Sequence, residues 1–377
     1  MTNVFLSLSS VFIVAFNSLA QITPIIQPSP RRVQVAILFD TSNSMDGLID
    51  QAKTRIWSII NELSALRYQG QMPTIEIALY DYGNSTLTLD NNYIRLQTAL
   101  TTDLDLISEK LFGLTTNGGD EYCGAVIQKS MQELGWSSNP LDLKMIYIAG
   151  NEPFNQGSIA YNEVCKTAGS RSIFVNTIYC GNYDQGVREF WKDCATIAGG
   201  DYFNIDANKQ VVHIDTPYDT QINNYNDSLN RTYYGYGSLG SVKKSNQLTQ
   251  DMNAQSEAVS VKAERAIVKS KASYKNESWD LIDAVDKGSV GLATIPEAEL
   301  PDEFKGKTEE EKNALLDEKR KDREVFQTKI NELAVERQKY IDEEMKKLPE
   351  GQDDFGTAVN ESLVKKANQI GYEKEKK

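Results

Sequence analysis

The chain has 377 residues, a formal net charge of −13 and an ordinary composition, with 40% hydrophobic and 25% charged residues. Such a composition allows a real hydrophobic core, and the length allows two or three domains. The acidic balance argues against nucleic acid as a partner, because phosphates require a basic surface, and against an anionic membrane surface for the same reason.

Residues 1–20 are predicted to be a secretory signal peptide. The apolar run from Val4 to Phe16 is too short to span a bilayer, and small residues at Ser18 and Ala20 suit cleavage after Ala20. No Lys or Arg precedes the run, so an uncleaved anchor is the alternative. We therefore expect an exported protein (periplasmic, cell-surface or secreted) with no stable transmembrane segment after cleavage.

Residues 21–32 contain three prolines and predict an extended lead-in, after which strand-like and helix-like segments alternate. The expected strands are 33–39, 74–82, 93–100, 144–149, 172–179 and 201–205. The expected helices are 48–66, 103–112, 121–134, 159–168, 186–198 and 217–229. This alternation predicts a three-layer, doubly wound α/β domain over 33–234, with a mostly parallel sheet and helices on both faces. Ligands of such sheets bind beyond the carboxyl ends of the strands, here in the loops after Phe39, Phe112, Ala149 and Tyr179.

The character of the sequence changes after residue 234. Three glycines within 235–245 predict a flexible joint, followed by a helical extension over 246–377. Within it we expect a polar helical segment at 246–287, a long charged helix at 308–348 and a short helix at 355–370. The apolar positions of the long helix are too irregular for a sustained heptad repeat, so we expect it to pack on 246–287 or on the sheet domain. Residues 373–377 are expected to be frayed.

A motif that could bind a metal ion follows the first expected strand: Phe39-Asp40-Thr41-Ser42-Asn43-Ser44-Met45. A carboxylate and two hydroxyl oxygens at a strand end can converge on one hard cation such as Mg²⁺. The simpler alternative is that Asp40, Ser42 and Ser44 cap the helix that follows.

Asp-x-Ser-x-Ser between an apolar strand and an amphipathic helix resembles the metal-ion-dependent adhesion site (MIDAS) of the von Willebrand factor type A (vWA) family. The order of strands and helices fits that family over about residues 33–230, so the chain resembles a secreted, bacterial-type vWA protein with a helical C-terminal extension. The resemblance implies a bound Mg²⁺ (or Mn²⁺ or Ca²⁺) with an open coordination position. An acidic residue of a partner protein would complete the coordination.

The family completes this site from two further loops, and the chain departs from its pattern in both. The family has a Thr after paired glycines, where this chain has Asp120 after Gly118-Gly119. The family has an Asp after the next buried strand, where this chain has Asn151 and Glu152. The resemblance therefore implies Asp40, Ser42, Ser44 and Asp120 as ligands, with Thr116 and Asn151 as further candidates.

Neighbouring loops carry side chains that could form the rim of a partner-binding surface, or could be ordinary loop packing. These are Met45, Asn84, Tyr122, Glu152, Pro153, Phe154 and Tyr183. The four cysteines allow two disulfides in an oxidising compartment, and buried free thiols are the alternative. Their expected positions suggest Cys123 with Cys180 and Cys165 with Cys194.

Enzymatic functions have less support. The single histidine, His213, lies past the last strand and far from any nucleophile loop, and the paired glycines are not followed by the Lys-Ser/Thr of a phosphate loop. We expect non-enzymatic, metal-dependent protein binding, in adhesion or in the assembly of an extracytoplasmic complex. One alternative is a scaffold that acts through the helical extension and has a degenerate metal site. The other is a hydrolase that uses strand-end carboxylates such as Asp120 and Glu121.

Overall fold

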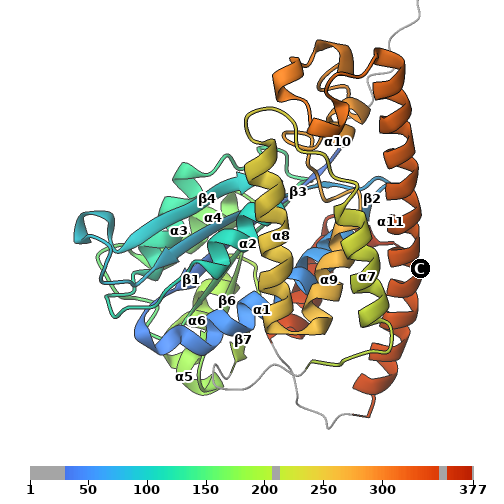
Figure 1. Cartoon of the computed structure of the whole chain (residues 1–377). Helices are drawn as coiled ribbons and strands as arrows, with labels where there is room; N and C mark the ends of the chain where they lie inside the picture. Colours follow the sequence, from blue (N-terminus) through green and yellow to red (C-terminus); the bar gives the residue numbers. More distant parts are fainter. Residues whose placement is uncertain (1–29, 206–212, 348–354, 376–377) are drawn as a thin grey trace, which may run out of the picture.

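A computed structural model describes residues 30–205, 213–347 and 355–375. Its main sheet has six strands in the order β4-β3-β1-β5-β6-β7 (Figure 1). The strands are β1 Arg32–Asp40, β3 Thr74–Tyr82, β4 Ile94–Thr101, β5 Leu143–Gly150, β6 Phe174–Cys180 and β7 Tyr202–Ile205. The edge strand β4 runs antiparallel to β3, and the other pairings are parallel. The predicted mostly parallel α/β fold is confirmed.

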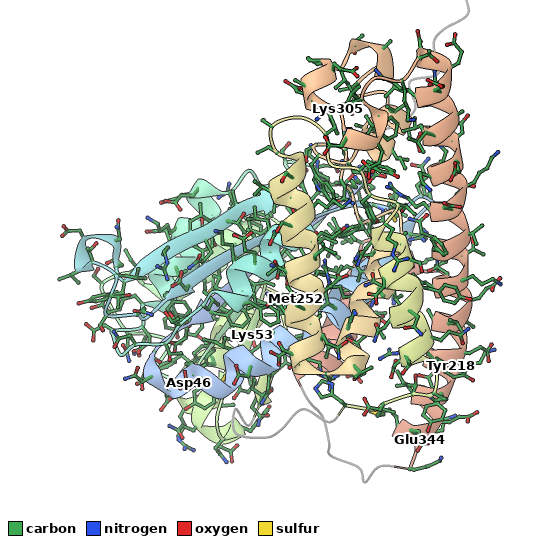
Figure 2. All side chains as sticks on the ribbon, viewed as in Figure 1. Asp46, Lys53, Tyr218, Met252, Lys305 and Glu344 are labelled. Atoms are coloured by element: carbon green, nitrogen blue, oxygen red, sulfur yellow. A yellow bond between two sulfur atoms is a disulfide. The ribbon has the colours of Figure 1, made fainter. Side chains whose placement is uncertain are left out.

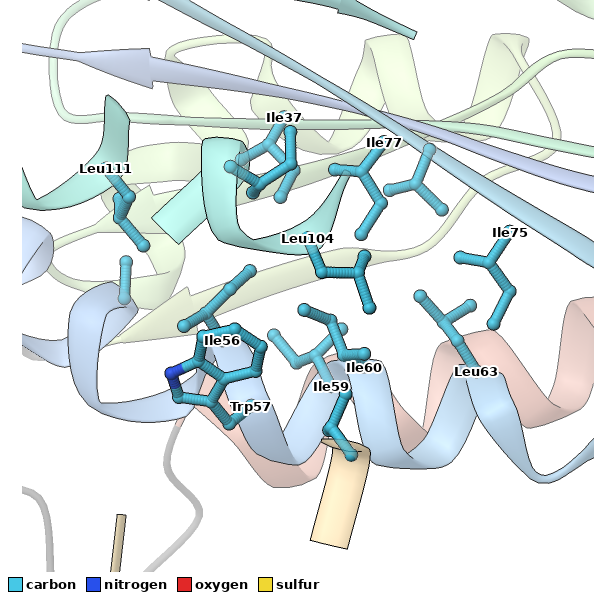
Figure 3. Packing of buried hydrophobic residues seen from close by; sticks show 14 of the residues in the cluster. Ile37, Ile56, Trp57, Ile59, Ile60, Leu63, Ile75, Ile77, Leu104 and Leu111 are labelled. Carbon is cyan, nitrogen blue, oxygen red and sulfur yellow. The ribbon is translucent and has the colours of Figure 1, made fainter. Parts of the chain in front are cut away.

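Helices cover both faces of this sheet. Helices α1 (Asp46–Ser64) and α2 (Leu104–Phe112) lie on one face, and α3 (Cys123–Glu133), α4 (Tyr161–Ser170) and α6 (Trp191–Ile197) lie on the other. Successive residues of β1 alternate between the two hydrophobic clusters, as expected for a central strand buried on both sides. Figure 3 shows the first cluster, in which Ile37, Ile75 and Ile77 of the strands meet Ile60 and Leu63 of α1.

The C-terminal region is mainly helical. Its helices are α7 Asp219–Asn230, α8 Gly240–Glu257, α9 Val259–Lys269, α10 Leu281–Asp286, α11 Glu309–Met345 and α12 Phe355–Gln369. The shorter helical elements of the chain are helix α5 (Tyr183–Arg188) and the 3-10 turns η1 Asn43–Met45, η2 Leu89–Asn91, η3 Leu292–Thr294, η4 Glu297–Glu299 and η5 Asp302–Phe304. Within the described residues no helix is both long and apolar enough to cross a membrane. The predicted signal peptide lies outside the described residues.

The helical region shares a hydrophobic core with one face of the sheet. Helices α9 and α12 pack on α1, and their Val261 and Leu363 belong to the same buried cluster as Val35 of β1. The long helix α11 packs on α7 and α9 along the outside of the molecule (Figure 1). Helix α8 begins inside the stretch expected to be a joint, and Tyr236 there donates its N–H to the carbonyl of Trp279. The predicted division of the chain into domains at residues 235–245 stays a prediction. The elements before and after this stretch pack against each other.

The end of the chain is ordered through residue 375, which corrects the expected frayed tail. Strand β8 (Tyr372–Lys374) pairs antiparallel with β2 (Leu66–Tyr68), more than 300 residues earlier in the sequence. Lys374 forms an ion pair with Glu62, and Arg67 forms one with Glu375. These partners are distant in sequence, so the terminal charges alone gave no sign of the pairing.

Candidate metal centre

The loop after β1 gathers three oxygen-bearing side chains. Asp40 ends the strand fully buried, and its Oδ1 accepts a hydrogen bond of 2.7 Å from the N–H of Ser42. The 3-10 turn η1 brings the hydroxyls of Ser42 and Ser44 to 3.1 Å from each other. Helix α1 follows, and neither Ser42 before η1 nor Met45 before α1 makes a side-chain capping bond to a described residue. The capping alternative is therefore not supported at these positions.

The second carboxylate oxygen of Asp40 is the notable atom of the loop. Oδ2 is buried and has no hydrogen-bond partner among the described residues. Burial raises the pKa of Asp40 to about 7, although the N–H and hydroxyl of Ser42 lower it. Two glycines give the carboxylate its space: a Cβ at Gly83 would lie 2.8 Å from Oδ1, and one at Gly150 would lie 3.2 Å from Oδ2. A buried, unpartnered carboxylate oxygen is costly, and a cation would satisfy it.

The loop after β5 adds a fourth oxygen-bearing side chain. Asn151 follows the last residue of the strand, and its Oδ1 accepts a hydrogen bond of 3.2 Å from the hydroxyl of Ser44. Glu152 lies near enough for its charge to raise the pKa of Asp40, as a smaller effect than burial. The structure therefore brings Asp40, Ser42, Ser44 and Asn151 together, and all four offer the oxygen donors that hard divalent cations prefer.

The loop before α3 turns a different carboxylate toward Asp40 than the one that was predicted. Asp120 is exposed and accepts a hydrogen bond of 3.2 Å from the hydroxyl of Tyr122. Glu121 is buried instead, and a Cβ at Gly83 would touch both its Cγ and Asp40. Burial, and then the charge of Asp40, raise the pKa of Glu121 to about 8. Sequence reasoning considered Glu121 only for acid–base work, and its single signal was its place beside Asp120.

Thr116, the other candidate ligand from the second loop, is hydrogen-bonded to a residue outside the cluster around Asp40. Its hydroxyl donates a hydrogen bond of 2.5 Å to Asp46, which lies at the surface at the start of α1 (Figure 2). Among the described residues no group of three or more His, Cys, Asp or Glu is arranged to hold a metal. A cation at this edge would therefore depend on hydroxyl and amide oxygens beside the carboxylate of Asp40.

Part of the predicted rim is wrong. Met45 and Phe154 are fully buried and Asn84 is nearly so, and none of them can meet a partner in this structure. Phe154 packs edge-on against Trp191, with ring centroids 4.9 Å apart, because its loop folds down onto α6. Tyr183 is 43% exposed. Tyr122, Glu152 and Pro153 are partly exposed, so these four residues are accessible.

The cysteines divide into one disulfide and two free thiols. Cys165 of α4 and Cys194 of α6 form a disulfide, one of the two pairs expected. The other expected pair is wrong, because Cys123 and Cys180 are free. They lie on opposite faces of the sheet: Cys123 belongs to the cluster with α3 and α4, whereas Cys180 packs against the cluster with α1.

No protein-family profile matches the sequence, and no curated protein matches it. In its fold, the chain is similar to vWA domains of known structure. The VWA domain of SpRpn10 is 17% identical, with 47% of this chain and 90% of that chain covered and a TM-score of 0.37. The conserved hypothetical protein BatB from Bacteroides thetaiotaomicron is 15% identical, with 46% and 90% covered and a TM-score of 0.36.

A third solved structure is proximal thread matrix protein 1 from the mussel byssus, described with a zinc-occupied MIDAS motif. It is 12% identical, with 48% of this chain and 43% of that chain covered and a TM-score of 0.36. The similarity to each of the three structures concerns the fold alone and spans less than half of this chain.

Proposed function

We propose that this protein binds a divalent cation at the carboxyl edge of its sheet and uses it for non-enzymatic binding of a partner protein. The observation that carries the proposal is the buried, unpartnered Oδ2 of Asp40 beside the row of Ser42, Ser44 and Asn151 oxygens. Mg²⁺ is the first candidate, with Mn²⁺ and Ca²⁺ as alternatives, since all three take oxygen ligands.

Asp40, Ser42, Ser44 and Asn151 would hold the cation. Glu121 and Glu152 add acidic groups beside Asp40, and a bound cation would favour the ionised form of each. Asp120 and Thr116 as second-loop ligands stay predictions. Four protein ligands would leave free coordination positions on a hard cation, and water or a carboxylate of a partner could fill them. When bound, the cation would supply a positive charge that attracts such a carboxylate.

An extracytoplasmic role in adhesion or complex assembly belongs to the same proposal. The disulfide between Cys165 and Cys194 supports it, because such bonds persist in oxidising compartments. The accessible side chains next to the site are Tyr122, Glu152, Pro153 and Tyr183, and aromatic residues are common in protein interfaces. They form the surface on which a partner would bind.

Calorimetric titration of the full chain with Mg²⁺, Mn²⁺ and Ca²⁺ tests the metal site. We expect saturable binding at one site, a loss of affinity of more than about 100-fold in Asp40→Ala, and a smaller loss of about 10-fold in Ser44→Ala. Asp227→Ala removes the same charge from an exposed position on α7 and should bind metal like the wild type. Absence of binding at millimolar metal, or equal binding by Asp40→Ala, would contradict the proposal.

A further inference from the structure

Three buried side chains of the helical region bring an amine, an amide and a carboxylate together. Asn230 is the last residue of α7, Lys269 is the last residue of α9, and Asp251 lies in α8. Helices α7 and α8 both pack on α9 (Figure 1). Each of the three residues is more than nine-tenths buried, and the chain neighbours Leu229 and Val268 belong to the apolar core. The three polar groups are therefore shielded from bulk water.

The amine of Lys269 contacts both of the other groups. Its Nζ donates to Oδ1 of Asn230 at 2.5 Å, and to Oδ1 and Oδ2 of Asp251 at 3.1 and 3.0 Å. The amide nitrogen Nδ2 of Asn230 donates to Oδ2 of Asp251 at 2.7 Å. Because a carbonyl bond is about 1.2 Å long, Nζ lies no more than about 3.7 Å from the amide carbon Cγ of Asn230. A nucleophile attacks from a separation of roughly 3–3.5 Å, so the amine lies close to the position for attack.

The surroundings of Lys269 favour its neutral, nucleophilic form. Burial lowers the pKa of Lys269 to about 8 although the charge of Asp251 raises it, and the charge of Arg265 adds to the lowering. A desolvated lysine next to another cation is a common form of the amine nucleophile. Asp251 stays ionised: burial raises its pKa, but the charges of Lys269 and Arg265 outweigh burial and lower it. Its Oδ2 contacts both nitrogen atoms, so it lies on the path of a proton from one to the other.

We propose that Lys269 and Asn230 form an intramolecular amide bond, a covalent cross-link between the ends of α7 and α9. Nζ of the neutral amine attacks Cγ of Asn230, and the electron pair of the carbonyl moves to Oδ1. Asp251 takes a proton from Nζ and passes it to Nδ2. The carbonyl then re-forms, the bond between Cγ and Nδ2 breaks, and ammonia leaves. The three side chains supply every atom and proton of this step, so it requires no oxidant and no co-reactant.

The cross-link would fasten together helices that are already in contact. It joins residues 39 positions apart and links α7 to α9, the two helices on which α11 packs. Thiols do not cleave an amide bond, so it would hold these helices under reducing conditions, in which the disulfide between Cys165 and Cys194 is lost. This cross-link is independent of the metal site and of its function.

The mass of the intact full chain tests the cross-link. After incubation above about pH 8, where the amine is neutral, we expect most wild-type molecules to have lost about 17 Da, the mass of one ammonia. Lys269→Arg keeps the positive charge but cannot attack, because its guanidinium stays protonated, and it should keep its full mass. Asp251→Asn removes the group that transfers the proton and should slow the loss of ammonia by at least about 100-fold.

A matched control separates this reaction from other losses of ammonia. Lys271 also contacts an amide oxygen, Oδ1 of Asn61 at 2.9 Å, but it is partly exposed. Lys271→Arg should therefore lose ammonia like the wild type. Cyclisation of Gln21, if cleavage makes it the N-terminus, has the same mass change but would persist in Lys269→Arg. A loss of mass in Lys269→Arg equal to that of the wild type would overturn the proposal.

Tryptic digestion of the wild type locates the bond. Trypsin cuts after the arginines and lysines at 209, 231, 265 and 271, but not after a lysine whose amine is in an amide bond. The cross-linked chain should therefore give one fragment in which residues 210–231 are joined to residues 266–271. Absence of this fragment from the incubated wild type overturns the proposal, whether or not the variants fold.

Discussion

Replacing Asp251 by Asn is expected to lower the free energy of unfolding by about 3–5 kcal/mol, the cost of leaving buried charge unpaired. Asp251 is almost fully buried in α8 and accepts hydrogen bonds from Arg265 at 2.6 Å and from Lys269 at 3.0 Å. Arg265 donates to Oδ1, whereas Asn226 and Asn230 of α7 donate to Oδ2, the oxygen that also accepts the 3.0 Å bond from Lys269. The amide would leave Lys269 without its counter-charge in the interior, and Arg265 would keep only its ion pair with Asp105.

The same network joins the helical region to the sheet. Arg265 also donates to Asp105 of α2 at 2.7 Å and lies over the ring of Trp57 in α1, 4.6 Å from its centroid. We therefore expect one cooperative unfolding transition, in which strands and C-terminal helices unfold together. Urea denaturation followed by circular dichroism measures both the transition and the loss of stability.

Asp227→Asn is the matched control for Asp251→Asn. Asp227 is exposed on α7 and pairs with Lys262 at 3.2 Å, a surface ion pair worth about 0.2–1 kcal/mol. An Asp251→Asn variant that is no less stable than the control would contradict a structural role for the network.

The effect of Asp251→Asn should also depend on pH. Burial by itself would raise the pKa of Asp251, but the charges of Lys269 and Arg265 outweigh burial and hold the pKa below its usual value of 3.8. A depressed acid pKa contributes stability above the unfolded value and loses it as the pH falls through the folded value. The difference in stability between wild type and variant should therefore be full at pH 7 and shrink below about pH 4. A difference that stays constant down to pH 2 would contradict this origin.

Removal of the disulfide by Cys165→Ala with Cys194→Ala should cost about 3–4 kcal/mol. The bond joins residues separated by 29 positions, and closing a loop of that length in the unfolded chain accounts for this amount in the chain-entropy treatment. Its neighbours, Trp191 and Val164, are buried in the same cluster, so the two helices keep their packing without it.

Reduction supplies the control for the disulfide. Dithiothreitol should lower the urea midpoint of the wild type toward that of the double variant, and it should leave the double variant unchanged, because Cys123 and Cys180 are already free thiols. A wild-type midpoint that does not respond to dithiothreitol, or a double variant that does, would contradict this account.

The sequence predicted the sheet well because its signal is local. Parallel strands buried on both faces appear as short continuous apolar runs, and β1 and β5 are of this kind. The loop after β1 could likewise be predicted, since Asp40, Ser42 and Ser44 are neighbours in the chain. The turn between Gly118 and Glu121 could not. Its shape depends on backbone bonds from Ser85 to Gly118 and from Asn117 to Thr41, which accompany the inward position of Glu121.

The long helix shows a different limit of sequence reasoning. The four buried residues of α11 are Leu316, Arg323, Ile330 and Arg337, one every seven residues. The apolar residues alone form no heptad repeat, as predicted, because two positions of this buried line are arginines. Their partners are far away in sequence: Arg323 bonds to Asp280, and Arg337 bonds to Asp219. A charged residue in a buried line can be recognised only when its counter-charge is known.

The most direct test of the central claim, a cation site at the end of β1, is the position of Mn²⁺ in crystals of the full chain soaked in MnCl₂. The account predicts one anomalous peak within about 2.0–2.6 Å of the hydroxyl oxygens of Ser42 and Ser44 and close to Oδ2 of Asp40. The peak should be missing in crystals of Asp40→Ala. A wild-type map with no peak at this loop, or with Mn²⁺ bound only elsewhere on the acidic surface, would contradict it.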